Sequence, residues 1–275
     1  MTAVERYTSE HGWMDVASRD PHPALAPHVR RYWGVVERTT QPMRRREIPS
    51  QDVVAILSFG PRIRVDDAER TSFVAGLTES SVVTEHAGES YGIDVTFTPL
   101  GARMILGAPM CVLANEVVAF EDVWGRGAGE LLERLSEAPS WDDRFDLLDR
   151  VFAERLGRAI APPPAVAHAW GRLVTADGRL AVRELAAELG CSRSYLASQF
   201  REHVGLPPKV TARILRFQRA IRLLETDHTR LERIAFDCGY YDQAHFNRDF
   251  RAFAGSTPRE FLARLSPAAP GLAAD

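Results

Sequence analysis

The chain has 275 residues and a formal net charge of −3, with 26% charged and 45% hydrophobic residues. This composition is typical of a folded protein, and the length allows about two domains. No apolar run reaches the roughly 18 residues of a membrane-spanning helix, and the N-terminal residues lack the basic and apolar segments of a signal peptide. We therefore expect a cytoplasmic protein that does not bind a membrane.

Residues 1–157 predict a β-rich domain that ends in a helix. The apolar run 53–59 is typical of a buried strand, because it ends at a Gly-Pro pair. Residues 92–98 alternate apolar and polar side chains, which indicates a half-buried strand. Residues 31–39 and 62–66 predict two further strands, and short helices are expected after Pro99 and Gly129.

A longer helix begins at Ser140, which with Asp143 forms a capping-box-like start. Its apolar face is broad, and we expect one side to rest on the sheet while the other meets a second copy of the chain. The alternative is that the whole face packs on its own sheet in a monomer. The candidate dimerisation residues are Trp141, Phe145, Leu148 and Phe152. Residues 158–164 (RAIAPPP) predict a stiff, proline-rich linker.

The part after the linker is basic and contains an internal repeat. Residues 168–275 hold 16 basic and 12 acidic side chains, a net charge of +4, whereas residues 1–167 hold 18 basic and 25 acidic ones, a net charge of −7. The pattern Leu185-Ala186 and Gly190 returns 49 residues later as Ile234-Ala235 and Gly239. After one inserted residue the match continues at an offset of 50, with Leu196, Phe200, Arg201, Gly205, Pro208 and Lys209 against Phe246, Phe250, Arg251, Gly255, Pro258 and Arg259. Two similar units therefore lie in tandem.

Each repeat predicts a helix-turn-helix unit. The glycines Gly190 and Gly239 end the first helix of each unit, and Ser192 and Asp242 are expected to cap the second. The outward face of the second helix is the part that enters a DNA major groove in such units. It carries Arg193, Ser194, Ala197, Ser198 and Arg201 in the first copy, and Gln243, Ala244, Asn247, Arg248 and Arg251 in the second.

The second copy is predicted to read more of a DNA sequence than the first. Arginine, glutamine and asparagine make paired hydrogen bonds to bases, whereas the first copy is poor in such donors. The alternative is that both faces are only solvated helix surfaces. A helix over residues 208–226, about 27 Å long, is expected to join the two units.

Residues 165–265 resemble the DNA-binding domain of the AraC/XylS family of bacterial transcription regulators. The stretch IAFDCGYYDQAHFNRDFRAFAG carries the most specific part of the resemblance. Ser198 and Thr211 depart from it, since the family often has arginine and an aromatic residue there. The resemblance implies base-reading positions at Arg193, Ser194, Ala197 and Ser198 in the first unit and at Gln243, Ala244, His245 and Arg248 in the second.

The resemblance also implies an α+β architecture, in which a β-rich N-terminal domain precedes an all-α domain. That second domain, residues 165–266, has two tandem helix-turn-helix units joined by a linker helix, and residues 267–275 are expected to be a flexible tail. The implied partners are double-stranded DNA, a small-molecule effector and, as a further candidate, RNA polymerase. The N-terminal part resembles poorly characterised domains attached to a subset of these regulators, which implies a sensing or dimerising role.

The candidate effector-binding residues are aromatic and basic side chains of the N-terminal part. The aromatic ones are suited to line an apolar pocket, and the run 44–46 is suited to an anionic effector. Core packing and a solvated strand edge are the alternatives. The candidates are Trp33, Arg44, Arg46, Phe59, Tyr91 and Phe97.

The sequence therefore favours a ligand-responsive transcription regulator that binds DNA. We expect no cofactor and no metal, since the three cysteines and the histidines lack ligand spacing. We also expect no enzymatic activity, because no catalytic or phosphate-binding fingerprint is present. One alternative is a DNA-tethered enzyme or alkylation-responsive protein that uses Cys111. Another is a dimeric DNA-binding regulator that needs no ligand.

Overall fold

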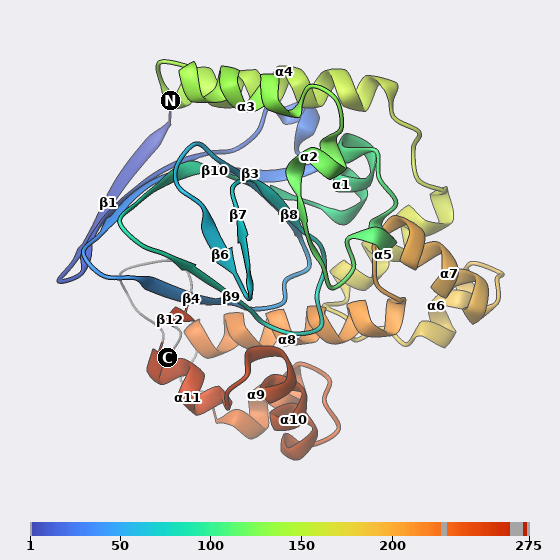
Figure 1. Cartoon of the computed structure of the whole chain (residues 1–275). Helices are drawn as coiled ribbons and strands as arrows, with labels where there is room; N and C mark the ends of the chain where they lie inside the picture. The colour runs from blue at the N-terminus through green and yellow to red at the C-terminus, as the bar shows by residue number, and fades with distance from the viewer. Residues whose placement is uncertain (1, 227–229, 265–271, 274–275) are drawn as a thin grey trace.

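The computed structural model describes residues 2–226, 230–264 and 272–273 (Figure 1). Strands form just over half of the first 119 residues, and helices form most of the described residues after them. The predicted fold class is thus confirmed. The predicted tail lies outside the described residues except for Leu272–Ala273, a short strand β12 that pairs with the N-terminal region.

Two antiparallel sheets form the N-terminal region. The larger sheet has seven strands in the order β1 (Ala3–Ser9), β2 (Gly12–Arg19), β3 (Val29–Thr39), β10 (Glu89–Phe97), β5 (Val53–Ser58), β8 (Phe73–Ala75) and β11 (Val117–Ala119). The smaller sheet has the order β12, β4 (Met43–Glu47), β9 (Val82–His86), β6 (Ile63–Val65) and β7 (Ala68–Arg70). The strands predicted at 31–39, 53–59, 62–66 and 92–98 are found as β3, β5, β6 and β10.

Strand β10 lies at the centre of the larger sheet and shows how the two faces differ. Asp94 on this strand is paired with Trp33 of β3 and Ile56 of β5. Its neighbours Ile93 and Val95 are fully buried on the other face. Because successive side chains of a strand alternate between faces, Asp94 is directed toward the smaller sheet.

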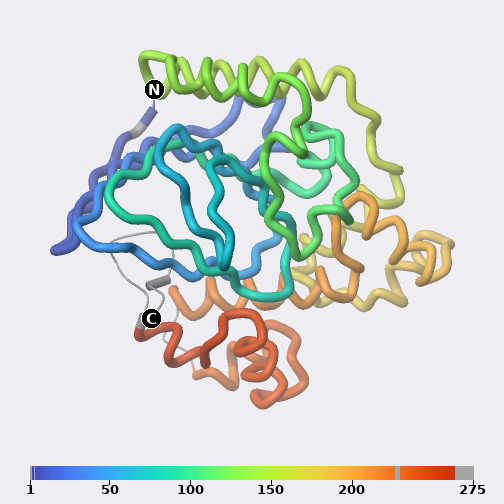
Figure 2. The backbone as a smooth tube through the Cα atoms, viewed as in Figure 1, coloured from blue at the N-terminus to red at the C-terminus, as the bar shows by residue number. Residues whose placement is uncertain are grey.

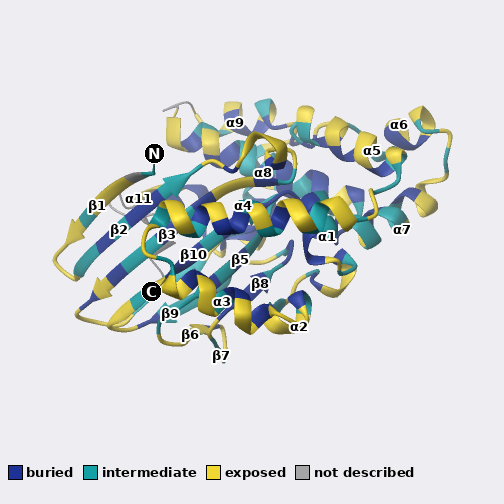
Figure 3. Cartoon of the chain, turned by 90° about the horizontal axis from the view of Figure 1, so that it is seen from above, coloured by how far each residue is buried: buried dark blue, intermediate teal, exposed yellow. Residues whose placement is uncertain are grey.

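Helix α4 (Trp141–Arg158) covers the outer face of the larger sheet (Figure 3). It begins as predicted, since the Ser140 hydroxyl accepts a hydrogen bond from the Asp143 N–H at 3.1 Å. The Phe145 ring stacks on Tyr32 with ring centroids 5.4 Å apart. Trp141 lies directly on Gly34, where an added Cβ would come within 2.4 Å of the indole ring. Glycine is therefore required for this close approach.

The apolar face of α4 is used within the chain. Phe145 and Leu148 are 0% exposed, and the Phe152 ring packs edge-on against Phe97. The expectation that one side of this face meets a second copy is therefore wrong for these three residues. Trp141 is half-buried against the sheet as well. The open alternative, in which the whole face packs on its own sheet, describes the structure.

Shorter helices close one end of the β-region. They are α1 (Pro99–Leu106), α2 (Phe120–Trp124) and α3 (Ala128–Glu137), with a 3-10 turn, η2, at Met110–Val112. The Arg155 guanidinium of α4 donates hydrogen bonds to the carbonyl groups of Ile105 and Trp124, at 3.0 and 2.9 Å. These contacts satisfy carbonyl groups at two helix ends and fix α4 against α1 and α2.

Seven helices follow the linker within the described residues. They are α5 (Pro164–Thr175), α6 (Val182–Glu188), α7 (Arg193–His203), α8 (Pro208–Thr226), α9 (Leu231–Asp237), α10 (Gln243–Ala254) and α11 (Pro258–Arg264). Helix α8 has the predicted bounds 208–226. It runs along the lower side of the β-region in Figure 1, with α9 to α11 on its other side, and Figure 2 shows the same course. None of the helices in the described part of the chain is long and apolar enough to cross a membrane.

Candidate DNA-binding face and ligand pocket

Helices α7 and α10 are the second helices of the two repeats, and they begin in the same way. The Ser192 hydroxyl accepts the Tyr195 N–H at 3.1 Å, and the Asp242 carboxylate accepts the His245 N–H at 2.7 Å. Both predicted caps are thus confirmed. Gly190 and Gly239 precede them in the left-handed conformation, with φ of 61° and 76°, which permits the sharp turn between the two helices of each unit.

The outward faces of α7 and α10 carry two arginines each, and Arg201 and Arg251 occupy matching positions of the repeat. Arg193 and Arg201 are exposed on α7, and Arg248 and Arg251 are exposed on α10. None of the four has an ion-pair partner among the described residues. Ser194, Ser198 and Ala244 are exposed beside them, whereas Ala197, Gln243, His245 and Asn247 are half-buried.

Asn247 lies at the edge of the outward face of α10 rather than at its centre. Its side-chain oxygen is buried and accepts no hydrogen bond from the described residues. Tyr195, by contrast, was not among the residues singled out from the sequence, yet it is 52% exposed on α7. The offset of 50 residues pairs Tyr195 with His245, and that correspondence was the signal that could have found it.

A charged contact fixes α10 on the linker helix α8. The Arg213 guanidinium of α8 donates to both carboxylate oxygens of Asp249, at 3.1 and 3.3 Å. These hydrogen bonds raise the pKa of Arg213 against the opposing effect of burial. The His245 ring lies 3.8 Å from the same carboxylate. The Arg213–Asp249 contact therefore fixes the inner side of α10 on α8.

Helix α8 also contacts loops of the β-region. Arg213 lies 3.8 Å from Glu79, and the Gln218 side-chain amide donates to the Pro49 carbonyl group at 2.5 Å. Ser50 and Thr78 are the immediate neighbours of these contact residues, and both line the cavity between the two sheets. Helix α8 thus contacts the rim of the cavity and also, through Arg213, helix α10.

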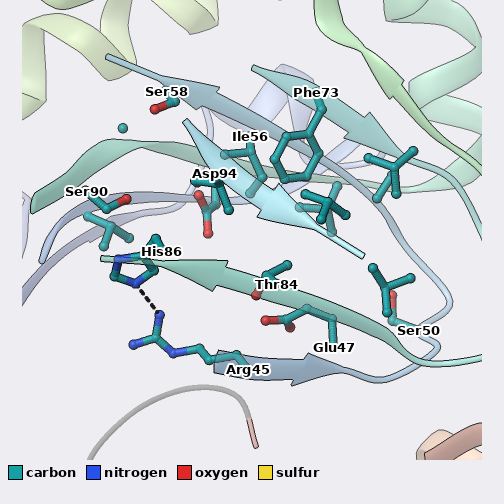
Figure 4. A pocket seen from close by; sticks show the side chains of 18 of the residues that line it. Arg45, Glu47, Ser50, Ile56, Ser58, Phe73, Thr84, His86, Ser90 and Asp94 are labelled. Carbon is teal, nitrogen blue, oxygen red and sulfur yellow. Dashed lines mark hydrogen bonds between the residues drawn. The ribbon is translucent and has the colours of Figure 1, made fainter. Parts of the chain in front are cut away.

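The cavity between the sheets has a volume of about 380 Å³ (Figure 4), within the range typical of small-molecule sites. Most of its wall is apolar. That part includes Val35, Val54, Ile56, Ile63, Val65, Phe73, Val82 and Val117. Ionisable side chains from both sheets gather in the rest, namely Glu37, Arg45, Glu47, Asp52, His86 and Asp94.

Glu37, Arg45 and His86 form a closed group in this wall. The Arg45 guanidinium donates to both carboxylate oxygens of Glu37, one at 2.9 Å, and His86 Nε2 lies 2.9 Å from Glu37 Oε2. Burial acts to raise the pKa of Glu37, but the hydrogen bonds from His86 and Arg45 bring it down to about 2. Glu37 is therefore ionised at neutral pH.

Two other carboxyl groups in the wall have pKa values displaced in the opposite direction. Burial, together with repulsion from Glu47, raises the pKa of Asp94 to about 7. Burial also raises the pKa of Glu47, against the attraction of Arg45 and a hydrogen bond from Thr84. The exposed part of the Asp94 side chain lies in the cavity wall. Its carboxyl group is therefore deep in the molecule but accessible from the cavity.

Only Tyr91 of the six effector candidates lines the cavity. Phe97 is 1% exposed and packs on the helix-covered face of the sheet, so this assignment is wrong. Trp33 and Phe59 lie outside the lining. Arg44 and Arg46 are directed away from it, toward Glu85 at 3.3 Å and the Ser81 hydroxyl at 3.0 Å respectively.

The ionisable cavity residues that the sequence did not indicate are Glu37, Glu47, Asp52, His86 and Asp94, whereas Arg45 belongs to the run 44–46 but is absent from the candidate residues. Arg45 lies between the two arginines that were chosen, and strand alternation alone separates it from them. Asp94 was read as part of the solvated face of its strand. That face is covered by the second sheet, which no local pattern reveals.

Cys111 is exposed in the η2 turn. Its sulfur lies 3.9 Å from a carboxylate oxygen of Glu202 on α7, and Arg103 of α1 lies 3.5 Å from the same carboxylate group. Cys111 is therefore part of the contact between the β-region and the first helix-turn-helix unit. No histidine or lysine accompanies it in these contacts to activate a thiol.

Comparison with known proteins gives two matching family models. Residues 185–264 match a helix-turn-helix domain, and residues 18–119 match a domain of unknown function, DUF6597. Two curated relatives are 36% identical to this chain. They are the F1 operon positive regulatory protein of Yersinia pestis, over 72 residues, and the HTH-type transcriptional activator RhaS of Escherichia fergusonii, over 76 residues. The matches cover 26% and 28% of this chain but only 24% and 27% of those proteins.

Two solved structures are similar to parts or most of the chain. ToxT from Vibrio cholerae O395 is 13% identical, with a TM-score of 0.47, covering 82% of this chain and 98% of that one. The DNA-binding domain of AdpA in complex with a target DNA is 26% identical, with a TM-score of 0.35, covering 37% and 92%. The matching model agrees with the repeat and the caps, so residues 185–264 form a helix-turn-helix domain, and residues 18–119 belong to a separate N-terminal region that matches a different family model.

Proposed function

We propose that the protein is a sequence-specific transcription regulator that binds double-stranded DNA through α7 and α10 and responds to a small molecule in the cavity between the sheets. One observation carries the DNA-binding part. Two helices with the same kind of cap present four exposed arginines on their outward faces, and no described acidic side chain pairs with them. Such arginines are suited to phosphates and to guanine bases.

The two helices are not equivalent as readers. Helix α10 offers Arg248 at the centre of its outward face and Gln243 at its N-terminal end, and both side chains can make paired hydrogen bonds to bases. Helix α7 offers Ser198 at the position of Arg248. We therefore assign most of the base discrimination to α10 and mainly backbone contacts to α7.

The contacts of α8 support a response to a ligand. Gln218 and Arg213 join α8 to Pro49 and Glu79, each next to a cavity-lining residue. A ligand that changes the position of these loops shifts the population of α8 orientations, provided that it binds the two states unequally. Because Arg213 of α8 is bound to Asp249 of α10, a change in the orientation of α8 also changes the position of α10.

The experiment starts by selecting duplexes from a random pool with the full chain. The binding of the selected duplex is then measured for Arg248→Ala and for Arg150→Ala, a matched control on the exposed side of α4. We expect Arg248→Ala to weaken binding and relax the base preference, and Arg150→Ala to leave both unchanged. A pool that yields no preferred sequence, or equal losses in the two variants, contradicts the proposal.

Self-association remains a prediction of the same account. One strong reading helix discriminates poorly by itself, and two copies on paired half-sites restore specificity. The face of α4 first considered for this contact is buried, so a dimer has to use another surface. Light scattering with and without the selected duplex measures it.

A further inference from the structure

We propose that the cavity between the two sheets binds an organic cation, a protonated amine carried on an apolar body. The inference rests on the proposed role of the cavity as an effector site, but the binding itself does not require DNA. It follows from the charges that face the cavity, from polar atoms in its wall that lack partners, and from the apolar part of the lining.

The charges that face the cavity leave two carboxyl groups without a cation of their own. Arg45 of β4 is held by Glu37 of β3 through two hydrogen bonds. Asp52, just before β5, is paired with Arg30 at 2.6 Å. The remaining carboxyl groups are Glu47 of β4 and Asp94 of β10.

An anionic ligand is disfavoured by this arrangement. It would meet Glu47 and Asp94 and would have to take Arg45 away from Glu37. Breaking that pair would leave a buried carboxylate without compensation, which is costly. A cation gains attraction from both surplus carboxyl groups and leaves the existing pair intact.

Unpaired hydrogen-bonding atoms in the wall point to the same kind of ligand. Asp94 accepts no hydrogen bond from the residues that the structure describes, although its carboxyl group faces the cavity (Figure 4). The His86 side chain is 8% exposed, and its Nδ1 atom is buried without a partner in the described part of the chain. His86 Nε2 lies 2.9 Å from Glu37 Oε2 and 3.2 Å from Arg45 Nη1, so Nδ1 is an acceptor only in the tautomer in which Nε2–H donates to Glu37.

An ammonium group carries three N–H donors and no acceptor. It therefore complements a wall in which the carboxyl oxygens of Asp94 are free acceptors. Buried polar groups without partners are costly, so a ligand that supplies donors to them gains affinity. A ligand with only acceptors leaves them unsatisfied.

The apolar part of the lining defines the rest of the ligand. Side chains of both sheets form it, including Ile56, Phe73 and Val117 from the larger sheet and Ile63 and Val65 from the smaller one. This surface carries no charge, so it favours a hydrocarbon or aromatic body. Together the two parts of the wall fit an amphipathic amine of a size suited to about 380 Å³.

The affinity for such a cation is expected to depend on pH. The ligand favours ionised Asp94, whose pKa in the unliganded protein is about 7. Below that pH, binding has to displace a proton, which reduces the affinity by up to tenfold per pH unit for one such group. The other titratable and charged groups that face Asp94 across the cavity are Glu37, Arg45, Glu47, Asp52, His86 and Tyr91, and Arg45 acts to lower the pKa of Asp94.

The test uses three probes that share one body and differ in the charge of the head group: 4-phenylbutylamine, 4-phenylbutan-1-ol and 4-phenylbutyric acid. Their binding to the full chain is measured by titration calorimetry at pH 8 and pH 6. We expect the amine to bind at least tenfold more tightly than the alcohol at pH 8, and the acid to bind most weakly. The advantage of the amine should shrink at pH 6.

Two substitutions locate the effect. Asp94→Asn and Glu47→Gln should each reduce the affinity for the amine by tenfold or more and leave the affinity for the alcohol nearly unchanged. The control is Glu85→Gln, which removes a carboxylate of β9 that is paired with Arg44 outside the cavity. Circular dichroism verifies that each variant is folded, and if one is not, the pH dependence of the unmodified chain carries the test.

Tighter binding of the acid than of the amine overturns the proposal, as does an unchanged preference in folded Asp94→Asn. Absence of binding of all three probes at millimolar concentration overturns it too. These outcomes are separate from the proposed function. Failure to bind any DNA, with amine binding as expected, contradicts the regulator but not the cation site, and the reverse result contradicts only the cation site.

Discussion

Asp94 is a carboxyl group held where its charge is unfavourable. The folded chain raises its pKa to about 7 from an ordinary value of 3.8, so between these two values the folded state keeps a proton that the unfolded state releases. The free energy of unfolding therefore falls as the pH rises through this window. Such a group costs stability and is typical of functional sites.

The first prediction concerns the variant Asp94→Asn without any ligand. Its free energy of unfolding relative to the unmodified chain should increase from pH 4 to pH 7 and stay constant above. The upper bound of the increase is about 4 kcal/mol, which is the full pKa difference expressed as energy. Denaturant unfolding at a series of pH values measures it. A difference that does not change with pH shows that Asp94 titrates normally.

The second prediction compares the two reading helices. Arg248→Ala should cost roughly 1–3 kcal/mol of DNA-binding free energy and relax the base preference at one position, because a paired contact to a base is lost. Ser198→Ala, at the corresponding position of α7, should change the affinity little. Competition binding with the selected duplex and its single-base variants distinguishes them. Similar losses in both show that the assignment of the two units is wrong.

At the scale of single elements, helix α4 is a structural layer. Leu148 is 0% exposed between this helix and the sheet, and the neighbouring aromatic rings stack on the sheet through Tyr32. The cavity lies on the opposite face of the same sheet. Helix α4 therefore stabilises the sheet that forms one wall of the cavity, although α4 itself lies outside the cavity.

The third prediction tests this role. Leu148→Ala should lower the free energy of unfolding by about 2–5 kcal/mol, the usual cost of removing a buried leucine side chain. Glu133→Ala on the exposed side of α3 should change it by less than about 0.5 kcal/mol. Chemical unfolding of the two variants provides the values. A small loss of stability together with dissociation of a dimer would instead restore the interface first expected for α4.

The fourth prediction concerns helix α8. Gln218→Ala removes the hydrogen bond to the Pro49 carbonyl group at the cavity rim, while the contact of Arg213 with α10 is retained. The measured quantity is the ratio of DNA affinities with and without 4-phenylbutylamine. We expect this ratio to be closer to one in Gln218→Ala than in the unmodified chain. Glu225→Gln, on an exposed position of α8, is the control. A ligand effect that is equally large in Gln218→Ala excludes this contact as a route of coupling.

Helices were predictable where local chemistry determines them. Ser140, Ser192 and Asp242 cap the helices that they were expected to cap, and the bounds of α8 agree at both ends. Short strands such as β8 and β9 were not predicted. Three to five residues carry too little periodicity, and pairing with distant strands decides their formation.

At the scale of the whole molecule, the cavity is the feature that the sequence conceals. Its ionisable wall combines β3, β4, β9 and β10 from two sheets. The sequence shows Asp94 alternating with apolar residues, but not that a second sheet covers its face. The exposed faces of α7 and α10 were predictable because each lies on one helix and the repeat presents it twice.

The two regions of the chain differ in net charge, as the proposed DNA binding by the C-terminal region requires. The net charge of residues 168–275 is +4, whereas that of residues 1–167 is −7. The basic excess is small, so affinity for DNA depends on where the arginines lie. Arg213, Arg219 and Arg222 are engaged in ion pairs within the helical region, whereas the four arginines on the outward faces of α7 and α10 have no ion-pair partner among the described residues.

The salt dependence of DNA binding by the full chain tests the central claim most directly. Four arginines that each displace about one condensed counterion predict a loss of affinity of about 100-fold between 50 and 200 mM salt. Replacing Arg193, Arg201, Arg248 and Arg251 by alanine should remove most of that slope. An affinity for the selected duplex that stays constant over this range, or a slope unchanged in the fourfold variant, would contradict DNA binding through these two helices.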